Sequence, residues 1–199
     1  MEKANASIVK ALSYSKKPYL AFSGGKDSVA MLHLVLKHDP DIQVRLYDFG
    51  PKMPRVYFHE SITISTQLGA VNFAIFERYK SFLPDMFGVH FPRMVKEGYD
   101  LCFVGLRKAE SAKRRRRMLS GRNLTSIKEN WPLAEWTADD VWGYIFANNL
   151  PYHSHYDTYS QLYDPRDCRF SSYFDGFFKF LGKENEDSFF NWRYAHKEI

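Results

Sequence analysis

The sequence predicts an α/β fold, a three-layer sandwich in which a mostly parallel, twisted sheet is flanked by helices. Strand-like and helix-like segments alternate through the first two-thirds of the chain, as in strand–helix–strand units. The 199 residues suffice for one substantial domain, and a hydrophobic content of 45% suits a packed core. A glycine-rich break separates the first predicted strand from the helix that follows it.

The first two strands and the helix between them have the clearest patterns. Residues 18–22 form a short apolar run, which the small residues 23–25 interrupt. Residues 27–37 follow with many apolar side chains, which predicts a well-buried helix. Residues 42–49 predict a second strand, and a Gly-Pro pair ends it.

The middle of the chain continues the alternation. Residues 56–68 favour a helix despite several β-branched side chains. Residues 71–76 favour a third strand. Residues 82–96 predict a helix that is broken around Gly88 and Pro92, because proline lacks the amide hydrogen that the helix ladder needs.

The last predicted elements lie on either side of a change in composition. Residues 100–104 predict a fourth strand. Thr137 is expected to cap a later helix, with Asp140 in an acidic variant of the capping box. That helix covers residues 141–148 and stops before Pro151. Beyond it the chain is rich in aromatic and charged residues with poor periodicity, which predicts an irregular to helical, aromatic-rich C-terminal region.

Composition limits the class of protein. We expect one domain overall, with residues 1–126 as an α/β core and residues 127–199 as an extension packed on it. Cys102 and Cys168 are too few for a disulfide framework or a four-thiolate metal site. No stretch approaches about 18 consecutive apolar residues, and the first 17 residues lack the apolar segment of a secretory signal. We therefore expect a cytoplasmic protein without a membrane span.

The charge balance weakly favours an anionic ligand. The 28 Lys and Arg residues exceed the 23 Asp and Glu residues, giving a net charge of +5. A polyanion such as a nucleotide or a nucleic acid fits this balance. Residues 113–117 form a dense basic run that would cover most of the circumference of a helix, so only some of these residues can face one site. The others are available to nucleic acid or to solvent.

One hexapeptide carries specific chemistry. Ser-Gly-Gly-Lys-Asp-Ser, residues 23–28, lies between the first predicted strand and the first predicted helix. Its glycines let the backbone turn sharply and approach a ligand closely. The first helical N–H groups lack intrahelical partners and lie at the positive end of the helix dipole, so a phosphate is the natural occupant. The alternative is a tight turn that only joins the strand to the helix. The pattern differs from the Walker loop, whose glycines are spaced more widely.

The hexapeptide resembles the PP-loop of the ATP pyrophosphatase, or adenine nucleotide α-hydrolase-like, superfamily. Within that superfamily, later stretches resemble the phosphoadenosine phosphosulfate (PAPS) reductase family. Gly-Leu-Arg-Lys-Ala-Glu-Ser at residues 105–111, followed by arginines 114–117, resembles its Gly-hydrophobic-Arg-x-x-Glu-Ser segment. Residues 131–145 resemble its Pro-Leu-x-x-Trp-x-x-x-Asp-Val-Trp-x-Tyr-Ile block. Residues 150–157 resemble its Leu-Pro-Tyr-Asn-Pro-Leu-Tyr-Asp segment.

The resemblance implies a site for an adenine nucleotide, either ATP or PAPS, accompanied by Mg²⁺. It assigns catalytic roles to Lys26, Asp27 and Arg107, with Asp27 either orienting the loop or binding metal. With only two cysteines in the chain we expect no iron–sulfur cluster, and we assign no residues as a protein metal site. The residues expected to contact the nucleotide are Ser23, Gly24, Gly25, Lys26, Asp27, Ser28, Asp48, Gly105, Arg107 and Glu110.

Departures from the family pattern argue against reduction by the family's route. Family reductases attack the sulfonate with a cysteine in a C-terminal Glu-Cys-Gly-Ile/Leu-His motif, whereas residues 191–199 contain no cysteine. Where some relatives carry Gly-Cys-x-x-Cys-Thr, this chain has Cys168 and then Ser171. Arg166 and Arg169 flank Cys168 and could activate its thiolate. Packing is the commoner role of a free cysteine.

Two further positions each have a functional and a structural interpretation. Asp48, at the predicted end of the second strand, resembles the aspartate of the family's Asp-Thr-Gly. It could bind ribose or Mg²⁺, or it could initiate a turn through its own backbone. Arg107 could offer its guanidinium fork to phosphate or sulfate, with Glu110 orienting it, or it could form a surface ion pair.

The region after residue 150 contains alternating histidines and regularly spaced tyrosines. In an extended segment His153, His155 and Asp157 would share one side as metal ligands, but a loop lining the nucleotide pocket is the favoured interpretation. A helical stripe that packs in the core is the favoured interpretation of Tyr152, Tyr156, Tyr159 and Tyr163.

Three functional hypotheses follow. The first is an enzyme that splits ATP into AMP and pyrophosphate to activate an acceptor, with sulfur transfer as a natural extension. The second is a sulfotransferase or reductase-like protein that binds PAPS or adenosine phosphosulfate and needs a partner thiol. The third is a non-catalytic nucleotide-binding subunit. The acceptor is open between nucleic acid and protein, a homo-oligomer is compatible with the sequence, and no membrane partner is expected.

Overall fold

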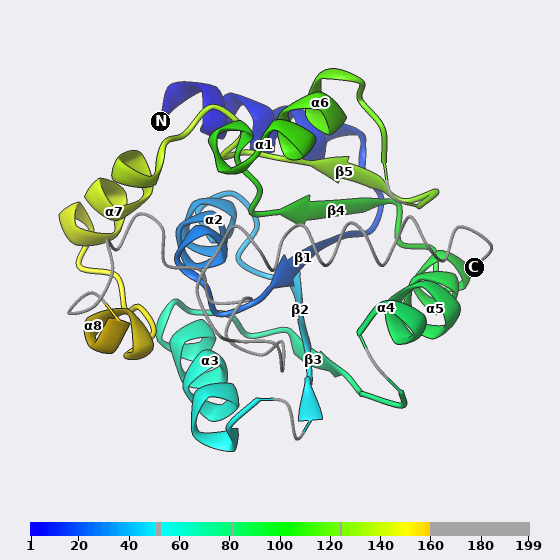
Figure 1. Cartoon of the computed structure of the whole chain (residues 1–199). Coiled ribbons are helices and arrows are strands. Elements are labelled where there is room, and N and C mark those ends of the chain that lie inside the picture. Colours follow the sequence, from blue (N-terminus) through cyan, green and yellow to red (C-terminus); the bar gives the residue numbers. More distant parts are fainter. Residues whose placement is uncertain (51–52, 81, 124, 160–199) are drawn as a thin grey trace.

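The computed structural model describes residues 1–50, 53–80, 82–123 and 125–159 (Figure 1). Within them lies a five-stranded sheet in the order β3-β2-β1-β4-β5, and each neighbouring pair is parallel. The strands are β1 (Pro18–Phe22), β2 (Gln43–Tyr47), β3 (Phe73–Phe76), β4 (Leu101–Val104) and β5 (Lys128–Asn130). The chain order reverses on the two sides of β1, and ligands of such sheets bind at this switch point, outside the carboxyl ends of the strands.

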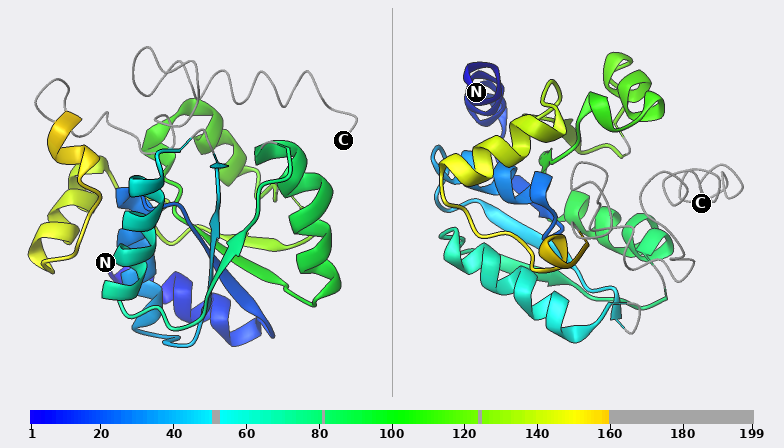
Figure 2. Two further views of the ribbon diagram at one scale, coloured as in Figure 1. Left: turned by 90° about the horizontal axis from the view of Figure 1, so that it is seen from below. Right: turned by 60° about the vertical axis from the view of Figure 1, so that its left-hand side comes forward.

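Helices cover both faces of this sheet, which confirms the predicted three-layer α/β sandwich (Figure 2). The larger apolar cluster lies under α1 (Glu2–Tyr14), α2 (Lys26–Leu36), α3 (Arg55–Gln67) and α7 (Ala138–Ala147). The smaller cluster lies under α4 (Phe82–Asp85), the π-helix η2 (Met86–His90) and α5 (Phe91–Lys96). Successive side chains of a strand point to opposite faces of the sheet. Leu20 and Phe22 therefore belong to the larger cluster, and Tyr19 belongs to the smaller one.

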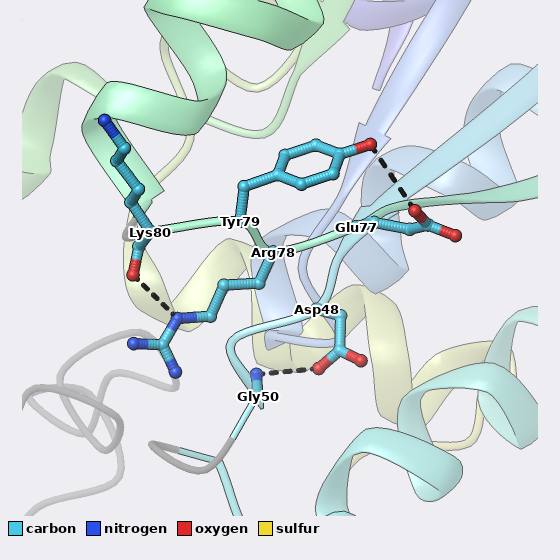
Figure 3. A pocket seen from close by; sticks show the side chains of 6 residues that line it. All are labelled: Asp48, Gly50, Glu77, Arg78, Tyr79 and Lys80. Atoms are coloured by element: carbon cyan, nitrogen blue, oxygen red, sulfur yellow. Dashed lines mark hydrogen bonds between the residues drawn. The ribbon is translucent and has the colours of Figure 1, made fainter.

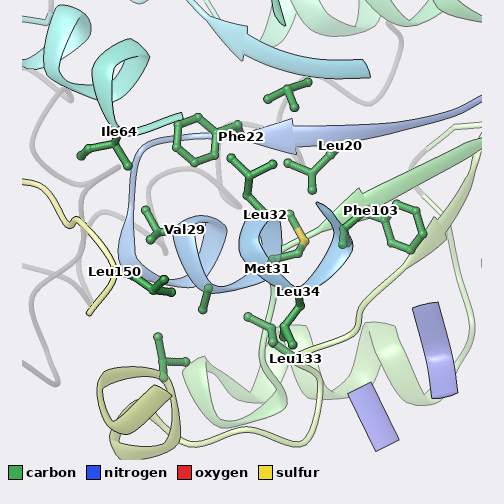
Figure 4. Packing of buried hydrophobic residues seen from close by; sticks show 14 of the residues in the cluster. Leu20, Phe22, Val29, Met31, Leu32, Leu34, Ile64, Phe103, Leu133 and Leu150 are labelled. Atoms are coloured by element: carbon green, nitrogen blue, oxygen red, sulfur yellow. The ribbon is translucent and has the colours of Figure 1, made fainter. Parts of the chain in front are cut away.

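Helix α2 is the centre of the larger cluster. Val29, Leu32 and Val35 are fully buried, and the helix packs against β1, β4, α3 and α7 (Figure 4). Each such aliphatic side chain contributes roughly 1.5–3 kcal/mol when it is buried. This packing fixes the position of the first turn of α2, and hence of the glycine-rich loop that precedes it.

The predicted helix over residues 82–96 is divided into three pieces. α4 passes into η2 at Met86, and α5 begins at Phe91. Gly88 lies inside the π-helix rather than at a break. Pro92 lies in the first turn of α5, where the missing amide hydrogen has no helical partner to lose.

Neither α1 nor β5 was predicted from the sequence. In α1 the small side chains of Ala4 and Ala11 are buried with Ile8 on one face of a largely polar helix. β5 has the polar sequence Lys-Glu-Asn, and it pairs with β4 through its backbone. The division at residue 126 stays a prediction. Those expectations that concern residues 160–199, including Cys168 and Tyr163, lie outside the described residues.

The capping box of α7 is confirmed. The Thr137 hydroxyl oxygen accepts from the Asp140 amide at 3.1 Å, and Asp140 Oδ2 accepts from the Thr137 amide at 2.7 Å. Together they satisfy two of the amides that a helix start leaves without partners. In the described part of the chain, no helix has both the length and the apolar character needed to cross a membrane.

Candidate functional site

The loop between β1 and α2 is held in shape by its own serines. Gly24 has a φ of +81°, a conformation that residues with a Cβ rarely adopt, and Gly25 is the N-cap of α2. The Ser28 hydroxyl donates to the Gly25 carbonyl at 2.8 Å, and Ser23 Oγ accepts from the Gly25 amide at 3.3 Å. The Ser23 hydroxyl also lies 3.1 Å from Ser28 Oγ. The predicted turn is therefore present at the positive end of the α2 dipole.

Two buried cations meet one carboxylate at this turn. Arg107 Nε donates to Asp27 Oδ1 at 2.5 Å, and Lys26 Nζ lies 3.6 Å from Asp27 Oδ2. The Lys26 and Arg107 residues are only 1% and 4% exposed. Arg107 is thus engaged in a buried ion pair and not in the surface pair that the sequence also allowed.

The charge on Asp27 is stabilised by these partners. Burial alone would raise the pKa of Asp27, but the positive charges of Lys26 and Arg107 and the hydrogen bond from Arg107 hold it below its ordinary value. The carboxylate is therefore ionised at neutral pH. It orients both cations beside the amides of the first α2 turn.

Gly105 lets the end of β4 approach the loop. A Cβ on Gly105 would lie 3.1 Å from the Asp27 carbonyl carbon and oxygen and from the Ser28 amide nitrogen. Backbone atoms move aside less easily than a flexible side chain, so this position favours glycine. The close approach brings the segment after β4, with Arg107, onto the first turn of α2.

Glu110 supports Arg107 through the backbone. It lies at the end of the 3₁₀ helix η3 (Lys108–Glu110), and its Oε2 accepts from the Arg107 amide at 2.9 Å. The same carboxylate forms an ion pair with Arg114, which lies in α6 (Ala112–Leu119). In these contacts Glu110 binds the backbone of Arg107 and not its guanidinium. It therefore orients the segment that carries Arg107.

Tyr156, which we predicted to be a core residue, is buried and also belongs to the site. It lies in α8 (His155–Tyr159), and its hydroxyl oxygen accepts from the Lys26 amide at 3.0 Å. The Lys26 ammonium lies 5.6 Å from the centre of the Tyr156 ring. The spacing of the tyrosines in the sequence gives no sign of this contact, because it joins residues 130 positions apart.

A buried histidine pair holds α8 in place. His153 Nε2 lies 3.1 Å from Glu60 Oε2 and 3.2 Å from the Tyr57 carbonyl oxygen, so it donates from Nε2. His153 Nδ1 must then accept, at 2.9 Å, the proton on His155 Nδ1. Burial lowers the pKa of both rings, that of His155 to about 3, and the His153 ring and the Lys26 ammonium beside it act in the same direction. Both rings are neutral at pH 7.

The aspartate at the end of β2 lies apart from this cluster of side chains. Asp48 Oδ1 accepts from the Gly50 amide at 2.7 Å, and both carboxylate oxygens accept from Arg55 Nη1. These contacts match the turn interpretation of Asp48. The residue also lines a polar pocket of about 450 Å³, whose other lining residues are Gly50, Glu77, Arg78, Tyr79 and Lys80 (Figure 3).

Comparisons with known proteins identify relatives of this chain. A family model described as "Phosphoadenosine phosphosulfate reductase domain" matches residues 17–82 and 90–175. The phosphoadenosine 5'-phosphosulfate reductase of Xylella fastidiosa (strain M23) is 28% identical over 161 residues, which cover 68% of this chain and 65% of the relative. The enzyme of the same name from Xanthomonas axonopodis pv. citri (strain 306) is 29% identical over 172 residues, covering 76% and 71%. The chain thus spans about two thirds of the length of these relatives.

Two solved structures share the fold. The PAPS reductase of Candida auris, a phosphate complex, has a TM-score of 0.55 at 13% identity, covering 78% of this chain and 84% of that one. The NH3-dependent NAD synthetase of Campylobacter jejuni, in complex with nitrate, has a TM-score of 0.54 at 14% identity, covering 80% and 75%.

The strand order and the glycine-rich loop after β1 define an α/β protein with the fold of these two structures. Within that class, the match of the family model to most of the chain is decisive. The chain belongs to the phosphoadenosine phosphosulfate reductase family.

Proposed function

We propose that the protein is an enzyme that binds an adenine nucleotide with its phosphate chain at the N-terminus of α2 and acts at the α-phosphate. The observation that carries this proposal is the group of Lys26, Asp27 and Arg107, in which two buried cations meet one carboxylate. The first turn of α2 adds the positive end of a helix dipole. Such an excess of buried positive charge favours an anionic ligand.

With ATP as substrate, a nucleophilic oxygen of an acceptor attacks the α-phosphorus. The bond from that phosphorus to the oxygen that bridges to the β-phosphate breaks, and its electron pair leaves with pyrophosphate. Lys26, at the positive end of the α2 dipole, is placed to stabilise the negative charge that develops on the leaving group. The products are pyrophosphate and an adenylylated acceptor, from which AMP is later released.

The residues around the loop are suited to a metal ion only if the ion arrives bound to the phosphates of the nucleotide. The two Asp27 oxygens already face Arg107 Nε at 2.5 Å and Lys26 Nζ at 3.6 Å. In the parts of the chain described, no group of three or more His, Cys, Asp or Glu side chains is arranged to hold a metal. We therefore assign Asp27 the role of orienting its two cations. Mg²⁺ carried on the phosphates would neutralise part of their charge during the reaction.

A sulfonucleotide is the second candidate ligand. The curated relatives are named phosphoadenosine 5'-phosphosulfate reductases. PAPS carries its sulfate on the same α-phosphate, and the same loop and cations would bind that anion. The reduction step also needs a thiol. For this candidate we therefore propose that PAPS binds and that its sulfonate is transferred to the sulfur of a partner thiol, with adenosine 3',5'-bisphosphate as the leaving group.

The first experiment measures binding and turnover together. Calorimetry gives the affinities for ATP with Mg²⁺ and for PAPS, and chromatography follows AMP, pyrophosphate and adenosine 3',5'-bisphosphate. Release of AMP and pyrophosphate supports the ATP reaction, whereas tighter binding of PAPS and release of the bisphosphate in the presence of thiol favours the second candidate. Failure of both nucleotides to bind would refute the proposal.

A substitution of the buried lysine tests the site. Lys26→Met keeps an unbranched side chain, one heavy atom shorter, and removes its charge, and a charged hydrogen bond to phosphate contributes about 1.5–3 kcal/mol. We expect nucleotide affinity to fall about 10- to 100-fold. Lys10→Met, on the exposed side of α1, is the matched control and should bind as the unmodified protein does. Equal affinities in the two variants would contradict the assignment.

A further inference from the structure

Helix α6 divides the basic run of the sequence between two faces. Ser111 caps the helix by accepting from the Arg114 amide at 3.1 Å, and the eight residues that follow include four consecutive arginines. Arg114 and Arg117 are half-buried and lie on the face toward the molecule, whereas Arg115 and Arg116 are exposed. The run is therefore not uniformly solvated.

The inward arginines are neutralised within the fold. Arg114 forms an ion pair with Glu110, and Arg117 forms one with Glu129 of β5. The Arg117 guanidinium also lies 5.6 Å from the centre of the Trp131 ring. These two side chains hold α6 against η3 and β5, so the orientation of the outer face is fixed.

The outer face is basic and has no carboxylate among its described partners. Ala112, Arg115, Arg116 and Leu119 are exposed at the spacing of one helical stripe, and Arg122 is exposed just beyond the end of the helix. In the described part of the chain, none of Arg115, Arg116 and Arg122 forms an ion pair with Asp or Glu.

In the described part of the chain, positive charge is concentrated toward this end. Residues 107–130 contain nine Lys and Arg residues and two acidic residues, Glu110 and Glu129, both of which pair with the inward arginines. Residues 1–17 contain four lysines and one glutamate. Since the net charge of the chain is +5, the remaining residues are net acidic. Helices α1 and α6 both lie at the β5 end of the sheet (Figures 1 and 2).

We propose that the outer face of α6, formed by Arg115, Arg116 and Arg122, binds the phosphate backbone of a nucleic acid. Guanidinium groups match phosphate geometry with two parallel hydrogen bonds, and closely spaced arginines match closely spaced phosphates. A membrane is a poorer partner, because Leu119 is the one large apolar side chain on this stripe. An acidic protein is a poorer partner too, because protein interfaces usually centre on aromatic or aliphatic anchors.

The surface is joined to the candidate site. Glu110 accepts from the Arg107 amide and pairs with Arg114, so one carboxylate links the cluster around Asp27 to α6. If the proposed function holds, on which this step rests, the nucleic acid bound along α6 is the class of acceptor that the activated nucleotide modifies. The binding surface itself does not depend on that reaction.

The test measures binding of fluorescein-labelled 20-nucleotide single-stranded DNA, duplex DNA and RNA by anisotropy over a range of salt. The variant Arg115→Ala/Arg116→Ala/Arg122→Ala removes the outer cations. Its control, Lys80→Ala/Arg93→Ala/Lys96→Ala, removes three exposed cations after β3 and on α5, so the net charge is the same. We expect the first variant to bind at least about tenfold more weakly, with its log–log salt slope shallower by about 2–3. The control should bind as the unmodified protein does.

Several outcomes would overturn the proposal. The first is that the unmodified protein binds none of the three nucleic acids, and the second is that both triple variants lose nucleic-acid affinity equally. The third is that the protein binds a polyglutamate of the same length with equal affinity, which would indicate an acidic protein partner. Lys26→Met should retain nucleic-acid binding while losing nucleotide binding, so failure of the proposed function is measured separately. Stimulation of AMP release by nucleic acid, present in the unmodified protein and lost in the α6 variant, tests the acceptor role.

Discussion

The buried histidine pair should make the protein sensitive to mild acid. His155 is 1% exposed and neutral in the fold, with a pKa lowered to about 3 by burial and by the neighbouring His153 ring and Lys26 ammonium. In the unfolded chain a histidine titrates near 6.5. Between those two values the unfolded state binds one more proton than the folded state. The stability due to neutral His155 is therefore complete above about pH 6.5 and is lost as the pH falls toward 3.

The size of the effect follows from the same linkage. The free energy of unfolding changes by about 1.4 kcal/mol per pH unit for each proton that only the unfolded state binds. From pH 7 to pH 5 the contribution of His155 falls by about 2 kcal/mol. Because pH 5 lies well above the lowered pKa, this figure barely depends on the exact value in the fold. The pKa of His153 is lowered as well, so its contribution has the same sign.

Urea unfolding followed by tryptophan fluorescence at pH 7 and pH 5 measures this loss. The variant His155→Asn retains a hydrogen-bond donor near the position of Nδ1 and cannot titrate. It should lose about 2 kcal/mol less than the unmodified protein over this pH interval. His38→Asn, at an exposed histidine that pairs with Asn5, is the control and should match the unmodified protein. Equal losses in the unmodified protein and in His155→Asn would refute the reasoning.

Further predictions concern the loop and its neighbours. Gly105→Ala places a Cβ 3.1 Å from the Asp27 backbone and should lower the free energy of unfolding by about 1–3 kcal/mol, measured by urea titration. Gly143→Ala, with nothing within 4 Å of its Cβ inside α7, should raise it by about 0.5–1 kcal/mol, and equal signs would contradict one of the two expectations. Tyr156→Phe removes the acceptor of the Lys26 amide and should cost about 1–2 kcal/mol by the same assay, and an unchanged value would count against this hydrogen bond.

Local chemistry made the fold and the loop predictable. Each of the features that was predicted correctly depends on residues that are close together in the sequence. They are the apolar runs of β1 and α2, the capping box at Thr137 and the glycines after Phe22. β5 was missed because its polar residues carry no pattern, and its place in the sheet comes from backbone pairing with β4. α1 was missed because two of its three buried residues are alanines, which give a weak hydrophobic signal.

The site was predictable only in part, because its decisive contacts are tertiary. Asp27 and Arg107 are 80 residues apart, and the sequence suggested each as a ligand contact without suggesting that they pair. Tyr156 was interpreted as core packing, and the structure adds its hydrogen bond to the Lys26 amide. Glu60 was not singled out, because its role depends on a contact with His153, which lies 93 positions away in the sequence. Such pairings depend on how the helices pack on the sheet.

The energetics of the site separate its function from the stability of the fold. Burying Lys26, Asp27 and Arg107 costs desolvation free energy, which their mutual attraction offsets only partly, so ion clusters of this kind are often no more stabilising than apolar residues of similar size. The first turn of α2 is fixed instead by the packing of Val29 and Leu32. We therefore attribute the presence of the buried charges to the proposed anionic ligand rather than to the stability of the fold.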